Sequence, residues 1–308
     1  MANEYEIIDS SKIYHMNLFL NELEYRTSHL HSEFEILYIV KNPLELRLPK
    51  ESYILNPDEA YIVNPNQVHQ LEKVEGASTF ICLQFSPALL KNIYPSLSHM
   101  RFKFTNLLES INGSEIRKTI LTLARLWQDY ENEKSIEITA LLFHLIYLII
   151  ESVPYRVLSQ KEKEEENANI SRVSRLLEFI DQGYTHKINL SDFANAEGLT
   201  LSYLSHFVKN VLSVPFQDYV NFLRFNYARK LLTTGNMRIT EAAYESGFSD
   251  PRYLTRTFMK YTGMNIREYR KIFSQNKNLE SGLKVHMSAH SLERYYSRRK
   301  SIELIDEL

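Results

Sequence analysis

The feature that most constrains this chain is a motif that occurs twice near its C-terminus. The first copy, LSDFANAEGLTLSYLSHFVKNVL, covers residues 190–212, and the second, ITEAAYESGFSDPRYLTRTFMKYT, covers residues 239–262. Each copy has a short apolar-periodic stretch, a turn made of glycine and an apolar residue, and a longer apolar-periodic stretch. This order is the sequence form of a helix-turn-helix, whose second helix enters the DNA major groove. The doubling predicts one subunit that contacts two grooves.

The two copies are related by a fixed offset along the chain. Aligning Gly198 with Gly247 gives a period of 49 residues, and aligning Leu204 with Leu254 gives 50, so the second copy has one extra residue in its turn. A long apolar-periodic helix is expected between them at 216–233. Two units are too few for a solenoid, which needs three or more repeats.

Length and composition bound the class of protein. The chain has 308 residues, enough for two domains, and it is 44% hydrophobic, so each domain can form a core. The single cysteine, Cys82, excludes an intrachain disulfide and a cysteine-based zinc cluster, which fits a reducing cytoplasm. The first residues lack the basic-then-apolar order of a signal peptide. The apolar run 136–150 is shorter than the roughly 20 residues of a membrane span, so we expect a buried helix and no membrane partner.

Charge is distributed unevenly along the chain. Residues 1–160 carry 14 Lys and Arg against 20 Asp and Glu, a net charge of −6, whereas residues 170–275 carry 14 against 9, a net charge of +5. The basic part holds both helix-turn-helix copies, as phosphate binding by one domain requires. A charge of +5 is also common on an ordinary solvated surface. The charge therefore supports DNA binding only together with the two motifs.

The remaining chain divides into a strand region and a helical region. Residues 30–85 are rich in alternating, β-branched and aromatic segments separated by Pro, Asn, Gly and Asp, which predicts an antiparallel barrel or sandwich. Apolar periodicity then predicts helices at 115–132, with Ile116, Ile120, Leu123 and Trp127 on one face, and at 134–153. The charged segment 159–169 is expected to be a linker.

Three segments of the C-terminal part together resemble the AraC/XylS family of bacterial transcription regulators. They are NFLRFNYARKLL at 221–232, EAAYESGFSDPRYLTRTFMKYTG at 241–263 and IREYRK at 266–271. The N-terminal part more loosely resembles the cupin sensor barrel of that family through the pattern of His29, His31 and Glu35, followed by Pro65 and His69.

The resemblance implies an α+β multidomain architecture. We expect an N-terminal antiparallel, cupin-like β-barrel with two following helices, and a C-terminal all-α domain with two helix-turn-helix motifs. The expected divisions are a sensor barrel at 1–87, a helical interdomain or dimerisation segment at 88–158, the charged linker at 159–169, the DNA-binding domain at 170–273, and an extension at 274–308.

The second helix of each motif supplies the candidate DNA contacts. In the first copy Leu201, Leu204, Phe207 and Val208 are expected to pack inward, and in the second Tyr253 or Leu254, with Thr257 and Phe258. The residues left facing outward are the predicted DNA-binding set: Ser202, Ser205, His206, Lys209, Arg252, Thr255, Arg256 and Lys260.

Arg256 is the strongest candidate for base recognition, because a guanidinium can bond both acceptors of guanine, a pairing that provides about 1–3 kcal/mol of discrimination. The shorter Ser205 and His206 can contact fewer base edges. We therefore predict that the second copy discriminates sequence and that the first contributes positioning. A solvated polar helix face is the alternative explanation of these residues.

A cluster of polar residues in the strand region is the candidate effector pocket. His29, His31 and Glu35 are expected to alternate along one strand and so to face the same side, and His69 comes from a later strand. These four residues suit either a polar pocket for a small effector or a facial metal site. The metal alternative corresponds to a metal-dependent cupin enzyme fused to a DNA-binding domain.

The resemblance implies a non-catalytic, cytoplasmic regulator without a cofactor. Its expected partners are double-stranded DNA, a small-molecule effector (a sugar is the first expectation), RNA polymerase, and a second copy of the chain held through helices 115–132 and 134–153. Activation of a carbohydrate-utilisation operon is the leading expectation, and a stress or virulence regulator is the alternative. Beyond residue 274, an amphipathic helix with Leu292, Tyr295, Ile302 and Ile305 on one side is one prediction, and a disordered extension is the other.

Overall fold

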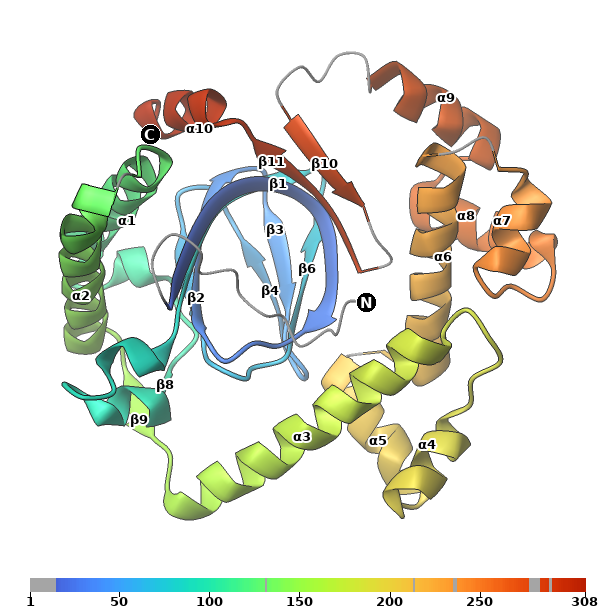
Figure 1. The fold of residues 1–308 in the computed structure, drawn as a ribbon, viewed down its shortest axis with the longest axis horizontal. Coiled ribbons are helices and arrows are strands. Elements are labelled where there is room, and N and C mark those ends of the chain that lie inside the picture. The colour runs from blue at the N-terminus through green and yellow to red at the C-terminus, as the bar shows by residue number, and fades with distance from the viewer. Residues whose placement is uncertain (1–14, 131, 213, 235–236, 277–282, 288–289) are drawn as a thin grey trace.

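The computed structural model describes residues 15–130, 132–212, 214–234, 237–276, 283–287 and 290–308. The N-terminal residues considered above for a signal peptide lie outside these ranges. A β-barrel occupies one side of the molecule, covered by helices on its outer face, and a helical domain occupies the other side (Figure 1). One long helix runs between them. This arrangement confirms the expected α+β class with a β-rich N-terminal part and an all-α domain that holds both motifs.

The barrel is built from antiparallel strands in the order β4-β3-β6-β1-β7-β2-β5. β1 is long and curved, and it pairs with β7 along its first half and with β6 along its second half. Alternating burial along β1 and β3 reflects one face packed inside the barrel. The bounds of the strands are β1 (Met16–His29), β2 (Phe34–Lys41), β3 (Leu44–Arg47), β4 (Ser52–Leu55), β5 (Ala60–Val63), β6 (His69–Lys73) and β7 (Ser78–Phe85).

Two helices, α1 (Gly113–Gln128) and α2 (Ser135–Ser152), pack on each other and cover the barrel from outside. The four residues predicted to lie on one face of the first helix, Ile116, Ile120, Leu123 and Trp127, are all buried. Short elements connect this layer to the rest: the strands β8 (Met100–Phe102) and β9 (Tyr155–Val157), and the 3₁₀ turns η1 (Pro87–Leu90), η2 (Pro95–His99), η3 (Leu107–Glu109) and η4 (Asn132–Lys134).

The expectation that the second of these helices is buried is only partly correct. One face of α2 packs in the core, but Ile136 and Tyr147 on the same helix are 83% and 56% exposed. The helix has 18 residues, longer than the run first considered, and it is long and apolar enough to cross a membrane by length and composition alone. Core helices of water-soluble proteins can have the same length and composition.

The charged segment predicted to be a linker is the first half of a helix, α3 (Gln160–Gly183). Ser159 begins this helix with a capping box, in which its hydroxyl accepts from the backbone of Glu162 and the Glu162 carboxylate accepts from the backbone of Ser159. A run of Lys and Glu is compatible with helix once such a cap starts it. The connection between the sensor and the DNA-binding domain is therefore helical rather than a flexible coil.

The helical domain contains two helix pairs, α4 with α5 and α7 with α8, at the positions of the two motifs. Each motif has its own hydrophobic core, and the helix between them contributes to both, with Tyr219 and Leu223 in the first and Phe225 and Leu232 in the second. The bounds are α4 (Leu190–Glu197), α5 (Leu201–Leu212), α6 (Phe216–Thr234), α7 (Ile239–Glu245), α8 (Pro251–Thr262) and α9 (Ile266–Asn276). Because α6 belongs to both cores, it fixes the two motifs relative to each other.

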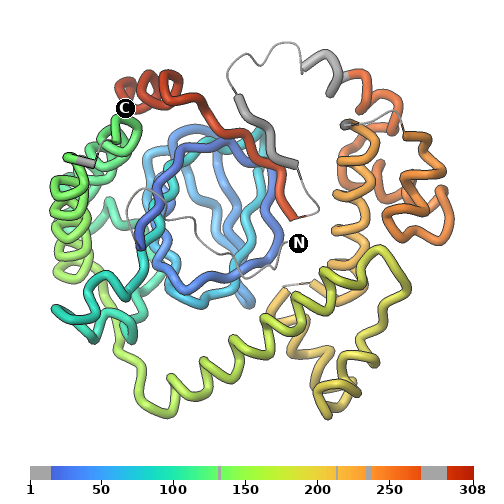
Figure 2. Tube along the Cα trace, viewed as in Figure 1, coloured from blue at the N-terminus to red at the C-terminus, as the bar shows by residue number. Residues whose placement is uncertain are grey.

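The C-terminal extension returns to the sensor barrel (Figure 2). It forms β10 (Leu283–Met287), β11 (Ser291–Tyr296) and α10 (Arg298–Asp306), and β11 pairs with the outer edge of β1. The predicted amphipathic helix is therefore wrong for Leu292 and Tyr295, which lie on a strand, and holds only further along the chain. The buried carboxylate of Glu293 accepts hydrogen bonds from Asn21 and Arg26 of β1. Strand pairing satisfies the free edge of β1, which a helix could not do.

Candidate functional site

The two helix-turn-helix motifs share the same turn geometry. Gly198 and Gly247 both adopt a positive φ, 64° and 87°, which L-residues rarely occupy. In each turn the backbone N–H of the following apolar residue donates to a carbonyl five residues earlier, Leu199 to Ala194 and Phe248 to Ala243, both at 2.9 Å. These repeated contacts show that the two copies are structural equivalents.

The packing of the second helix in each motif agrees with the prediction at four positions. Leu204 and Val208 of α5 are buried, and so are Leu254 and Phe258 of α8. The prediction is wrong for Leu201, which is 51% exposed because it is the first residue of α5 and lies beyond the core. Of the two alternatives for the inward-facing residue, Leu254 is buried and Tyr253 is exposed.

All eight residues of the predicted DNA-binding set are exposed. They lie on α5 and α8, on the sides of these helices that do not pack into the two cores. With the 50-residue offset, Ser202 is equivalent to Arg252 and His206 to Arg256. The structure thus offers the set to solvent on two equivalent helices.

The two arginines of the second copy differ in their surroundings. The Arg252 guanidinium donates to the Asp250 carboxylate at 2.9 and 2.6 Å. Among the described residues, the Arg256 side chain makes no hydrogen bond or ion pair. Arg256 can therefore turn to a ligand without giving up an existing partner, whereas Arg252 cannot.

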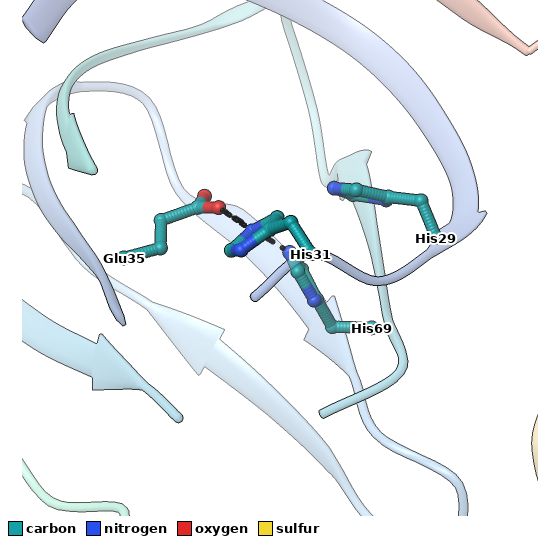
Figure 3. A group of neighbouring side chains, drawn as sticks. All are labelled: His29, His31, Glu35 and His69. Carbon is teal, nitrogen blue, oxygen red and sulfur yellow. Dashed lines mark hydrogen bonds and ion pairs between the residues drawn. The ribbon is translucent and has the colours of Figure 1, made fainter. Parts of the chain in front are cut away.

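The sensor cluster is brought together inside the barrel (Figure 3). His29 ends β1, His31 lies in the turn after it, Glu35 lies on β2 and His69 begins β6. All four side chains are buried, and their ligand atoms lie within 4.8 Å of one another. The expectation that the first three alternate along one strand is wrong, because the chain turns between β1 and β2, but the turn still directs them to the same point.

The three imidazoles share one hydrogen-bonding pattern. Nδ1 of each faces a backbone carbonyl two residues away: His29 faces Thr27 at 2.9 Å, His31 faces Glu33 at 3.1 Å and His69 faces Gln67 at 2.9 Å. Nδ1–H donation to a carbonyl orients a histidine so that Nε2 can bind a ligand, and histidines that bind metal ions usually make such a bond. The tautomers are inferred from these contacts.

Glu35 holds the negative charge of the cluster. Its carboxylate lies 2.6 Å from His31 Nε2 and 3.5 Å from His69 Nε2. Burial alone would raise the pKa of Glu35, but the hydrogen bond with His31 and the close contact with His69 outweigh it and hold that pKa well below its usual value. Burial, together with the nearby His69, lowers the pKa of His29 well below its usual value.

These residues fit a divalent transition metal ion. Three imidazoles and one carboxylate suit zinc, iron, manganese or nickel. If His31 donates Nδ1–H to a carbonyl, its Nε2 and the Glu35 carboxylate both present lone pairs to each other. A contact of 2.6 Å between them then requires a cation, either a second proton or a metal ion. Within the described residues, the buried Nε2 of His69 makes only the 3.5 Å contact with Glu35 and no well-formed hydrogen bond, so a bound ion would give it a partner.

The cavity beside the cluster is too small for a sugar. Its volume is about 10 Å³, roughly the space of one water molecule. Its walls include His29, Glu35 and the buried Glu293 of the C-terminal extension. The cavity beside the four residues predicted to line an effector pocket is therefore the size of one water molecule or ion.

Larger cavities lie between the barrel and the DNA-binding domain. One of about 670 Å³ is bounded by the barrel, α3 and α5, and another of about 310 Å³ by the barrel, α6 and α8. Sequence analysis did not find them, because their walls combine segments up to about 200 residues apart and contain no motif of their own. Among these walls, only α3 and α5 have apolar faces that were recognisable from the sequence.

The described architecture is that of a ligand-binding barrel joined to paired DNA-binding motifs, the arrangement of a ligand-responsive transcription regulator. A model of the AraC-like ligand binding domain matches residues 21–146, and a model of a helix-turn-helix domain matches residues 193–272. The chain belongs to the AraC family of DNA-binding transcription regulators.

Two of the relatives are regulators of operons. The melibiose operon regulatory protein of Escherichia coli is 23% identical over 85% of this chain and 91% of its own length. The lactose operon transcription activator of Staphylococcus xylosus is 24% identical over 60% of this chain and 66% of its own. Among solved structures, ToxT from Vibrio cholerae is 15% identical, covering 84% of this chain and 98% of its own, with a TM-score of 0.40.

Proposed function

We propose that this regulator activates a carbohydrate-utilisation operon in response to a sugar. Its relatives include the regulator of a melibiose operon and the activator of a lactose operon, and the first of these aligns along nearly its whole length. The ligand-binding domain supplies the sensor, and the paired helix-turn-helix domain supplies promoter recognition. Contact with RNA polymerase is the step that would convert binding into activation.

We assign DNA contact to the eight exposed residues of α5 and α8. Two recognition helices held by α6 would enter successive major grooves, whose centres lie about 34 Å apart. Arg256 is the base-specific contact in this assignment, and its side chain can approach the guanine edge without breaking an ion pair. The lysines Lys209 and Lys260 would contact phosphates, which fix position without carrying sequence information.

Selection of binding sites from random duplex DNA tests this function. We expect an enriched site with two short conserved blocks about one helical turn apart, one of them containing guanine. Footprinting and transcription from a promoter with that site, with and without sugar, then give the sign of regulation. Binding without sequence preference would contradict the assigned base contacts. Repression of the promoter would contradict the proposed activation but not DNA recognition.

A homodimer is proposed through the exposed apolar face of α2. Ile136 and Tyr147 lie on this face, outside the core that α2 shares with α1 and the barrel. Substituting Tyr147→Asp should place a charge in the interface and shift the protein to monomer in analytical ultracentrifugation. Glu137→Gln, a polar change on the same helix, is the matched control. A monomeric wild-type protein would contradict the proposal.

We also propose that the protein acts in the cytoplasm and catalyses no reaction. The relatives are transcriptional regulators, and the cavity of about 10 Å³ beside the histidines leaves no room for an organic substrate at the cluster. A cupin enzyme fused to a DNA-binding domain would need such room.

A second role is proposed for the barrel cluster, which is to hold one divalent transition metal ion through His29, His31, Glu35 and His69. Two observations support it: Nε2 of His69 makes only a long contact, 3.5 Å, with Glu35, and the three imidazoles share one Nδ1 pattern. The ion would join β1, β2 and β6 inside the barrel, which stabilises the sensor.

Elemental analysis tests the metal role. The purified protein should carry about one equivalent of metal, His69→Ala should lose it, and His144→Ala, a control at an exposed position of α2, should retain it. Absence of bound metal after incubation with zinc, manganese, iron and nickel salts would leave the cluster as a hydrogen-bonded histidine–carboxylate group.

A further inference from the structure

The largest of the cavities described above lies where the sensor meets the first helix-turn-helix. It has a volume of about 670 Å³, within the range of small-molecule sites. One wall is the barrel loop from Asn64 to Val68, a second is the N-terminal half of α3, and a third is the C-terminal half of α5. A ligand in this cleft would contact the sensor and a recognition helix at the same time.

The floor of the cleft is apolar. Leu30 and Val68 of the barrel meet Val173 of α3 and Val211 of α5 there, and all four are buried in one hydrophobic core. The ring of Phe207 also lines the cleft. Such a surface favours a ligand that has at least one face of C–H groups.

The charged groups in the walls are already neutralised by one another. Arg101 pairs with Glu166 at 2.6 Å, and Arg156 pairs with Glu162. The remaining carboxylate in the walls, that of Glu165, lies 3.8 Å from a lysine of the same helix. An ionic ligand would have to displace one of these partners, so the walls favour a neutral ligand.

The remaining polar wall groups are primary amides. They come from different elements: Asn66 and Gln67 from the barrel loop, Asn169 from α3 and Asn210 from α5. Each amide can donate and accept, which matches a hydroxyl that does both. A neutral molecule with many hydroxyls and an apolar face is a saccharide.

We propose that the effector of this protein is a neutral saccharide of one or two rings that binds in this cleft, not beside the histidine cluster in the barrel. The inference rests on the proposed function, because the sugar response is assumed there and only its site is new. The contrast between about 670 Å³ here and about 10 Å³ beside the histidines selects the cleft.

Binding in the cleft gives a direct coupling between sensor and DNA-binding domain. A sugar that contacts Asn66 of the barrel and Asn210 of α5 together stabilises one placement of α5 against the barrel. A ligand shifts such an equilibrium only by its difference in affinity for the two placements. The sugar therefore changes the affinity of the first motif for its half-site by the same factor that DNA changes the affinity for sugar.

A matched pair of substitutions on α3 tests the site. Asn169 lines the cleft, and Asn167 is an exposed residue two positions away that does not. Asn169→Trp should fill the cleft and weaken sugar binding at least tenfold, and Asn167→Trp should leave it unchanged. The measurement is calorimetric titration of the full chain with melibiose and lactose, with thermal unfolding and binding to the selected DNA site as checks of folding.

Each outcome decides the inference. Loss of sugar binding in Asn169→Trp alone, with DNA binding retained, supports the cleft. Equal sugar binding in the wild type and both variants overturns the cleft and leaves the proposed function in place. Binding of neither sugar by a wild type that binds its DNA site overturns the sugar response itself. If Asn169→Trp fails to fold, Asn210→Ala, which removes one amide from an exposed position, should still weaken sugar binding severalfold, and unchanged binding there counts against the cleft.

Discussion

The two helix-turn-helix motifs have the same turn geometry but different surroundings. The core of the first contains Leu30 and Val68 of the barrel, so this motif is packed on the sensor. Among the described residues, the core of the second contains no residue of the barrel. The first presents Ser202 and His206 where the second presents arginines.

This difference indicates a division of labour. We expect the motif whose core includes barrel residues to respond to ligand, and the motif with long cationic side chains to discriminate bases. Both depend on α6, which contributes residues to each core.

The largest expected difference between the copies concerns their turn glycines. A Cβ on Gly247 would lie 2.6 Å from the backbone oxygen of Thr185, whereas a Cβ on Gly198 would meet nothing within 4 Å. Gly198→Ala should lower the free energy of unfolding by about 1 kcal/mol, because alanine disfavours a positive φ. Gly247→Ala adds a backbone clash and should cost about 3 kcal/mol in total. Urea unfolding of both variants measures this, and equal losses would show that the close contact with Thr185 relaxes freely.

The next largest effect is expected on base preference. Arg256→Ala should cost about 1–3 kcal/mol in binding the preferred site and relax the preference at one base pair. His206→Ala, at the equivalent position of the first copy, should weaken binding less and leave base preference unchanged. Site selection repeated with each variant is the measurement. A loss of preference in His206→Ala and not in Arg256→Ala would reverse the division of labour.

The doubled motif was predictable from the sequence because its determinants are local. Glycine at the turn, Asp250 before Pro251, and apolar residues at helical spacing define each helix without reference to the rest of the fold. The meeting of His29, His31, Glu35 and His69 was also predicted, although not the turn that separates the first two from the third.

The features that sequence analysis missed are those that depend on distant pairing. The strand at Ser291–Tyr296 forms because β1 offers it a free edge, and nothing within that segment distinguishes this from a helix. The charged segment at 159–169 is helical because of its cap and the helix that follows it. The cleft forms only when the fold brings Val68 and Val211 together, so no single segment of the sequence predicts it.

The smallest expected difference concerns the N-caps of the recognition helices. Asp250 caps α8 with its carboxylate, and at the equivalent position of the first copy the Thr200 hydroxyl accepts from the backbone N–H of Tyr203. Hydrogen bonds from the side chain and the backbone of Arg252 hold the pKa of Asp250 below its usual value. A carboxyl with a lowered pKa in the folded state stabilises that state fully above its unfolded pKa, near 4, and loses this contribution as the pH falls through the folded pKa.

Asp250→Asn should isolate this charge, because asparagine caps a helix about as well as aspartate. At pH 7 the melting temperature of the variant should lie slightly below that of the wild type, and the gap should close as the pH is lowered from 5 towards 3. Thr200→Ser, which keeps a hydroxyl cap that does not titrate, should differ from the wild type by the same amount throughout. A constant gap for Asp250→Asn over this range would mean that its carboxylate contributes geometry to α8 and no charge-dependent stability, and the two caps would then be equivalent.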